Sequence, residues 1–155
     1  DPFAFEESYR AAGGIARFLT GTPSIVALPA LVGGLDTFDG IAMADVEAKS
    51  RALLELFIDE VEGRCGSQVR VFGPRDLAQR GSHVCFAHPE GYAVMQALIA
   101  RGIVGDFRAP DLMRFGFTPL YTRFEDAWRA ASALAEILET REWDQPRFRE
   151  RRRVT

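Results

Sequence analysis

The feature that most constrains the fold is a change of hydrophobic period after residue 64. Over residues 39–64, apolar residues recur near helical spacing with charged residues between them, which predicts an amphipathic helix. In the next two stretches, 68–72 and 82–87, apolar and polar residues alternate until a glycine or proline intervenes. Alternation of period two is typical of strands that bury one face. The chain therefore combines helices with neighbouring strands.

The pattern continues to the C-terminal end. Residues 90–101 and 124–140 return to helical spacing. Residues 103–107 and 112–117 predict two more strands, joined by a turn at residues 109–111. With an earlier helix described next, the order is helix, helix, strand, strand, helix, strand, strand, helix. This order predicts an α+β fold, a small mixed sheet with helices over one face.

The N-terminal part carries weaker signals. Residues 7–18 allow a short helix interrupted by two glycines, and the apolar residues 25–32 predict a buried helix. Thr22 suits the N-cap of that helix and Pro23 its first position, because proline lacks only an N–H that would have no partner there. Pro29 is expected to kink or divide the helix.

The chain divides into three segments by these patterns. Residues 1–38 form a segment that leads into the small sheet domain, which comprises residues 39–145. Residues 146–155 form an Arg-rich tail that we expect to be frayed. The first residues are apolar and include no Met, which suggests that the sequence is part of a longer one.

The composition excludes several classes of protein. Of the 155 residues, 47% are hydrophobic and 26% charged, a balance that excludes disordered and collagen-like chains. No apolar run is long enough for a membrane helix, and a net charge of −3 gives no reason to expect nucleic acid. Two cysteines are too few for a disulfide scaffold, so we expect free thiols in a reducing compartment, the cytoplasm.

Arg114 is the first candidate for binding a ligand. In the strand predicted over residues 112–117, alternation places Arg114 on one face with Leu112 and Gly116. A guanidinium beside a glycine, among apolar residues, suits a planar anion held by two parallel hydrogen bonds. An Asp or Glu of the same domain would satisfy it equally well, and the sequence leaves both interpretations open.

Thr22 is the second candidate. The N-terminus of a capped helix carries unpaired N–H groups and a partial positive charge, which can hold a phosphate or a carboxylate. Gly21 would allow a close approach, and Thr22 adds a hydroxyl donor. The alternative is a capped helix with no ligand.

Other polar residues give weaker signals. His83 and Cys85 share a strand face but lack further ligands at metal spacing, so no metal site is predicted, and His88 is interpreted as a turn residue. Lys49, the only lysine, lies among polar residues of its helix and is interpreted as solvated. Phosphate-loop, dinucleotide and nucleophile-elbow motifs are absent from the sequence.

Several segments together resemble one family. The runs RGIVGDFR at 101–108 and RFGFTPLY at 114–121 closely resemble the C-terminal domain of the bacterial kynureninases. The shorter runs FAF at 3–5 and IARFLTGTP at 15–23 resemble the same family. The resemblance covers about residues 1–140.

The resemblance implies a homodimeric, fold-type I, pyridoxal-phosphate enzyme. Such an enzyme hydrolyses L-kynurenine or 3-hydroxykynurenine to an anthranilate and L-alanine, in tryptophan catabolism. It implies that Arg114 binds the substrate α-carboxylate and that Thr22, with Gly21, binds the cofactor phosphate. The lysine that binds the cofactor covalently belongs to the large domain and has no counterpart here. No catalytic residue is therefore expected in this chain, which alone should be inactive.

Two other interpretations remain open. One is a desulfurase-like relative of the same fold class, which would need a reactive cysteine on a mobile loop; Cys65 and Cys85 are poor candidates. The other is a non-catalytic α+β module for binding or dimerisation. Pairing of Arg114 with a carboxylate of its own domain would favour the module. An Arg114 facing an open cleft, with Thr22 near a partner chain, would oppose it.

Overall fold

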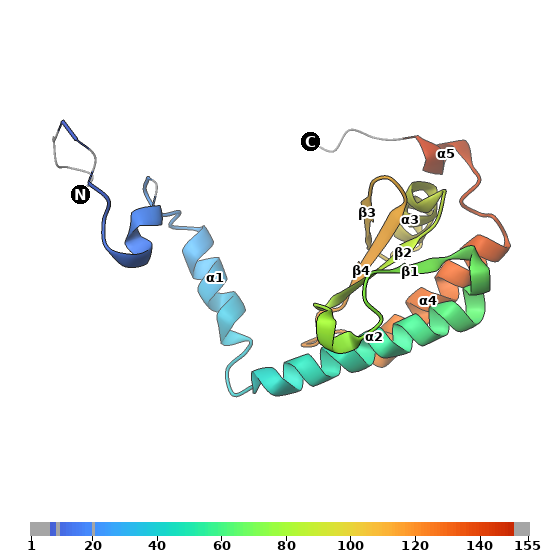
Figure 1. Cartoon of the computed structure of the whole chain (residues 1–155), viewed down its shortest axis with the longest axis horizontal. Coiled ribbons are helices and arrows are strands. Elements are labelled where there is room, and N and C mark those ends of the chain that lie inside the picture. The colour runs from blue at the N-terminus through green and yellow to red at the C-terminus, as the bar shows by residue number, and fades with distance from the viewer. Residues whose placement is uncertain (1–6, 9, 20, 151–155) are drawn as a thin grey trace. The chain divides into compact units, whose positions relative to one another are not determined.

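The computed structural model describes residues 7–8, 10–19 and 21–150 (Figure 1). The FAF run at 3–5 and residues 151–155 of the predicted tail lie outside this range. By its internal contacts the chain forms two compact units, Asp1–Ile41 and Ala42–Thr155, which we describe separately. Within the described residues, no helix is both long enough and apolar enough to cross a lipid bilayer.

The first unit contains a 3-10 helix, η1 (Gly14–Phe18), and one α-helix, α1 (Ala27–Asp36). The predicted helix over residues 7–18 is thus reduced to its second half, because Gly14 takes a positive φ of 58° at the start of η1. Residues 10–13 have no helical structure.

Helix α1 begins later than predicted. The Ala27 N–H donates to Ser24 Oγ at 3.2 Å, so a serine two residues beyond Thr22 bonds the first helical N–H. The predictions of Thr22 as N-cap and Pro23 as first helical residue are therefore wrong. Pro29 lies in the first turn, where its missing N–H costs no intrahelical bond, and the helix continues through it undivided.

The prediction that residues 25–32 form a buried helix is also wrong. The side chains of Ile25 and Val26 are 82% and 83% exposed, and the apolar residues of α1 itself are exposed as well: Leu28, Leu31, Val32 and Leu35. An apolar pattern shows what a helix can bury, but burial needs a second surface. The described residues of this unit provide none for α1.

The second unit contains the sheet. Its elements are α2 (Met43–Cys65), η2 (Gly66–Gln68), β1 (Arg70–Phe72), η3 (Leu77–Gln79), β2 (His83–Ala87), α3 (Gly91–Ala100), β3 (Asp106–Arg108), β4 (Leu112–Gly116), α4 (Phe124–Glu139) and α5 (Pro146–Arg149). The predicted helices and strands are confirmed, with shifted ends. Helix α2, predicted over residues 39–64, starts at Met43, after a turn in which Gly40 has φ 74°. Strand β3 is shorter than predicted, because the Ile103 N–H instead donates to Leu98 O at the end of α3.

The sheet has four strands in the order β1-β2-β4-β3, and all three pairs are antiparallel. The α+β class is confirmed, but the predicted mixed sheet is wrong. Since β2 and β4 lie side by side and antiparallel, α3 and β3 form the connection between them (Figure 1). The two central strands come from segments 25 or more residues apart, and their pairing fixes which side chains share a face.

The helices cover one face of this sheet. Helices α2 and α4 run side by side, and both contribute to a core that also includes the inward residues of β2 and β4 (Figure 1). Phe57 of α2 lies at its centre, with ring centroids 5.0–5.9 Å from three phenylalanines of the sheet and the segment after it: Phe86, Phe115 and Phe117. The prediction of helices over one face is confirmed.

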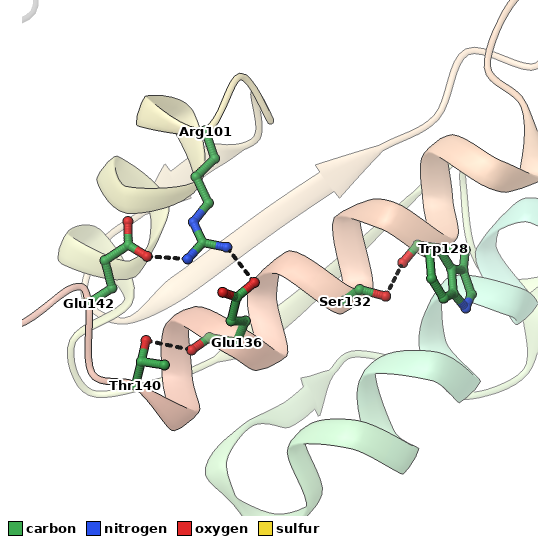
Figure 2. Close-up of polar contacts among 6 residues, drawn as sticks. All are labelled: Arg101, Trp128, Ser132, Glu136, Thr140 and Glu142. Carbon is green, nitrogen blue, oxygen red and sulfur yellow. Dashed lines mark hydrogen bonds and ion pairs between the residues drawn. The ribbon is translucent and has the colours of Figure 1, made fainter.

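Polar contacts close the C-terminal end of the unit. Arg101, at the end of α3, donates to Glu136 of α4 at 2.8 Å and also to Glu142, just after α4 (Figure 2). Within α4, Ser132 donates to the Trp128 carbonyl, and Thr140, which caps the helix, donates to the Glu136 carbonyl (Figure 2). One arginine thus joins α3, α4 and the turn beyond.

The segment after α4 is ordered, which corrects the predicted frayed tail as far as residue 150. Trp143 and Phe148 are buried at 9% and 5% exposure, and both belong to the core cluster. Arg149 forms an ion pair with Asp144 at 2.8 Å. The arginines flanking Phe148 therefore extend to the surface while the ring anchors α5.

Candidate functional site

Arg114 lies on the face of the sheet that the helices leave open. Its neighbours Met113 and Phe115 are buried, so the predicted alternation along β4 is confirmed. The register pairs Phe72 with Cys85, Cys85 with Arg114, and Arg114 with Asp106. Directly paired residues share a face, so these four side chains form one row across all four strands, which we call the open-face row.

Asp106 holds Arg114 within this row. Arg114 Nη2 donates to Asp106 Oδ2 at 2.5 Å, and Arg108 Nη2 lies 2.9 Å from the same oxygen. The Arg114 and Asp106 side chains are 37% and 43% exposed, so the pair adds little stability but fixes the direction of the guanidinium. The other N–H groups of Arg114 bond no described residue, and they can still donate hydrogen bonds to a planar anion.

The pKa of the Cys85 thiol depends on the charged groups around the open-face row. Burial raises the pKa of its thiol above the usual value, while the positive charges of Arg114, Arg80 and Arg108 act to lower it and Asp106 acts to raise it. Three guanidiniums and one carboxylate therefore act on the same sulfur atom. The open face has an excess of positive charge, which favours binding of an anion.

Thr22 and Gly21 lie in the first unit, five and six positions before α1 begins at Ala27. Gly21 has a positive φ of 77° with open space where a Cβ would be, and Thr22 is exposed. The Thr22 hydroxyl bonds no other described residue. It does not cap α1 as predicted, because Ser24 bonds the first helical N–H. Arg114, the other residue predicted to bind a ligand, belongs to the second unit.

Lys49 is not solvated as predicted. Its Nζ donates to the Pro119 carbonyl at 2.6 Å, and the side chain is half-buried. The bond joins α2 to the segment that follows β4, across 70 positions of sequence. The ammonium group of Lys49 therefore has a structural partner.

The two histidines lie in different surroundings. Among the described residues, no three potential ligands from His, Cys, Asp and Glu gather closely enough to hold a metal ion. His83 and Cys85 do share the open face, as the alternation predicts. His88 closes a turn: its Nδ1 accepts the Glu90 N–H at 3.0 Å and its ring contacts Trp143, so the structural interpretation agrees with its contacts.

The cysteines have the environment of packing residues. Cys65 is 3% exposed, and burial raises its pKa to about 11, with a smaller opposing effect from Arg64. Cys85 lies inside a strand and its pKa is raised as well. A nucleophilic cysteine needs a lowered pKa and solvent access, so neither residue suits desulfurase chemistry.

The sequence pattern does not distinguish two charged residues that act near Arg114 and Cys85, namely Asp106 and Arg80. Asp106 stands in the run 101–108, and period-two alternation through the turn at 109–111 would have placed it opposite Arg114 had the strand been assigned to residues 106–108. Arg80 lies outside any helix or strand, in the connection between β1 and β2. No local pattern distinguishes it from a surface arginine.

Comparison with known proteins gives one consistent result. A family model described as the kynureninase C-terminal domain matches residues 46–134. The chain is 51% identical over 154 residues to a kynureninase of Pseudomonas fluorescens, covering 99% of this chain and 37% of that protein. Kynureninases of Burkholderia mallei (strain SAVP1) and Burkholderia pseudomallei (strain 1106a) are each 49% identical over 155 residues, again covering 99% of the chain and 37% of the relative.

The matched region includes most of the sheet unit. Strands β1 to β4 and the open-face row fall inside residues 46–134, whereas Thr22 and Gly21 fall before it. The chain spans 37% of the length of the relatives it matches. On the match of more than half its residues to the family model, the chain belongs to the kynureninase C-terminal domain family.

Proposed function

We propose that this chain is the substrate-binding part of an enzyme that hydrolyses L-kynurenine or 3-hydroxykynurenine. The reaction cleaves the Cβ–Cγ bond and gives L-alanine and anthranilate or 3-hydroxyanthranilate. The relatives bear the name kynureninase, which supports this substrate class. The proposal includes a homodimer in the cytoplasm.

The placement of Arg114 carries the proposal. One Nη atom is held by Asp106, the remaining donors bond no described residue, and the side chain lies on the open face of the sheet. An α-carboxylate can take two parallel hydrogen bonds from such a guanidinium. A clamp of this kind fixes the rotation of the amino acid about its Cα, and thus sets which Cα bond is presented for cleavage. Arg114 contributes by binding and orientation and transfers no proton.

Thr22 and Gly21 suit the phosphate of pyridoxal phosphate. The hydroxyl of Thr22 is exposed and unengaged by described residues, and a Cβ on Gly21 would meet no atom, so a phosphate can approach the backbone there. Pyridoxal phosphate, when bound, withdraws electrons from the substrate Cα. Thr22 would donate a hydrogen bond to a phosphate oxygen.

The covalent attachment of the cofactor is proposed to come from residues beyond this chain. Lys49 is the only lysine, and its Nζ is bonded to Pro119 O on the second unit. An attachment lysine must be free to exchange its bond for one to the substrate. We therefore propose that these 155 residues alone are inactive.

The test is the Arg114→Ala variant in the full-length protein. Loss of a charge-assisted clamp should lower kcat/KM for L-kynurenine by about a hundredfold or more, mostly through KM. Arg114→Lys keeps the charge but loses the parallel hydrogen bonds, so its kcat/KM should lie between those of the wild-type protein and Arg114→Ala. Arg129→Ala is the control, because Arg129 is an exposed arginine of α4 paired with Glu125. Unchanged kinetics in Arg114→Ala would contradict the proposal.

A second candidate is a non-catalytic module for binding or dimerisation. The ion pair between Arg114 and Asp106 favours it, since a carboxylate of the same unit engages the guanidinium. The two candidates differ in what the full-length protein does with L-kynurenine. Release of anthranilate and L-alanine supports the enzyme, whereas binding of a partner chain with no turnover supports the module.

A further inference from the structure

Two nitrogens of the Arg80 guanidinium are buried without a partner, in a residue that is half-buried as a whole. Its Nε and Nη2 atoms are shut off from solvent, and no hydrogen-bond acceptor reaches either of them. The residue follows η3, and its backbone N–H bonds Leu77 O, which holds the start of the side chain in place. These are the only buried side-chain polar atoms without a partner among the described residues.

Such an arrangement is costly. A buried donor without an acceptor loses its hydration and gains nothing in return. Other arginines of the described chain do find carboxylates: Arg51, Arg64, Arg75, Arg101, Arg108, Arg114, Arg123, Arg129, Arg141 and Arg149. The buried donors of Arg80 have no such acceptor, so they call for an anion from elsewhere.

The position of Arg80 indicates where that anion binds. Arg80 comes three residues before β2, where His83 pairs with Gly116 of β4 and Ser82 O accepts the Phe117 N–H, so it lies at the end of the sheet to which the Arg114 strand runs. Its charge also acts on the Cys85 thiol, as those of Arg114 and Arg108 do. Cys85 is paired directly with Arg114 in the open-face row. Asp106, the carboxylate whose charge also acts on the Cys85 thiol, is already shared by Arg108 and Arg114. An anion placed over Cys85 would thus meet the donors of Arg114 and the uncompensated charge of Arg80.

We propose that Arg80 is the second cation of the carboxylate site on the open face of the sheet. Arg114 grips the substrate carboxylate, and Arg80 beside it supplies the attraction that Asp106 takes from Arg114. The buried edge of the Arg80 guanidinium is not screened by water, which strengthens its effect on an anion nearby. This inference rests on the proposed function for the identity of the substrate, but not for the existence of the anion site.

The experiment compares an acid with its amide. L-kynurenine and L-kynurenine carboxamide differ only at the carboxyl group, which is an anion in the first and a neutral amide in the second, and their dissociation constants are measured in the full-length protein. We expect Arg80→Gln to weaken binding of the acid about ten- to a hundredfold and to leave binding of the amide unchanged. Arg80→Lys, which retains the charge, should recover most of the loss. Arg75→Gln is the control, because Arg75 lies in the same β1–β2 connection but is paired with Glu62.

The thermal midpoint of unfolding separates two sources of the carboxylate. If the substrate supplies it, the free protein holds an uncompensated charge, and Arg80→Gln should leave the midpoint unchanged or raise it. If another part of the protein supplies it, Arg80→Gln should lower the midpoint without substrate, and the proposal is overturned. An equal loss of binding of the acid and of the amide would also overturn the proposal, because Arg80 would then support the structure of the site and not act on the charge of the carboxylate.

A second probe pair keeps this inference distinct from the proposed function. L-alanine and L-alaninamide carry the same difference in charge without the aromatic ketone. If the protein does not convert L-kynurenine, yet Arg80→Gln abolishes its preference for L-alanine over the amide, the function fails and the anion site stands. If Arg114→Ala abolishes turnover while Arg80→Gln changes neither preference, the function stands and the role of Arg80 fails.

Discussion

The two faces of the sheet differ although the same strands build them. On the covered face, Val84, Phe86, Met113 and Phe115 are all 4% exposed or less. On the open face, the residues between them are partly exposed, and charged side chains surround the Cys85 thiol. Adjacent residues of β4 thus serve packing and recognition in turn. Substitutions at neighbouring residues of β4 should therefore affect either stability or ligand binding, but not both.

The largest expected effect tests this separation at neighbouring positions. Phe115→Ala removes a ring that packs against Phe57 and Phe86, and should lower the free energy of unfolding by about 3–5 kcal/mol. Arg114→Ala, next to it, should lower it by less than about 1 kcal/mol, because its ion pair is more than a third exposed. Urea denaturation of the full-length variants measures both. Similar losses at the two positions would show that the faces are not independent.

An intermediate effect is expected at Asp106. Asp106→Asn replaces a charge-assisted bond to Arg114 by a weaker neutral one, so the guanidinium can turn. We expect KM for L-kynurenine to rise about three- to tenfold, while the free energy of unfolding changes by less than about 1 kcal/mol. Steady-state kinetics together with urea denaturation check this split. A large loss of stability with an unchanged KM would show that Asp106 stabilises the fold and does not orient Arg114 for binding.

The smallest effect concerns His88, which lies away from the open face. Burial lowers the pKa of His88 below its ordinary value of 6.5, against a smaller opposing effect of the Glu90 carboxylate. Between these two values the unfolded chain binds more protons than the folded one. The stability that neutral His88 contributes is therefore complete above pH 6.5 and is lost as the pH falls through the folded pKa. His88→Gln should flatten this part of the stability profile, measured by thermal unfolding from pH 8 to about pH 5. An unchanged profile in the variant would contradict the assignment.

Periodicity predicted the fold well because it depends on local spacing. The helix of α2, the strands β2 and β4 and the helix of α4 were all predicted from the repeat of apolar residues, and the outward position of Arg114 followed from alternation alone. The turn at 109–111 is local as well, and it joins β3 and β4 as predicted.

What could not be predicted depends on residues far apart in the sequence. The contact of Lys49 with Pro119 spans 70 positions, and nothing around Lys49 indicates it. The sharing of Asp106 by two arginines depends on the register of β3 and β4. The lack of a partner for Arg80 emerges only when every nearby carboxylate has been placed. For α1, the pattern showed an apolar surface but not what would cover it.

The ordered segment after α4 bears on how such domains can be exchanged between relatives. The family match ends at residue 134, inside α4, whereas Trp143 and Phe148 still belong to the core. A crossover at residue 134 would also pair Arg101 of one parent with Glu136 and Glu142 of the other (Figure 2). The module that recombination can transfer intact therefore extends through α5, some fifteen residues past the matched stretch.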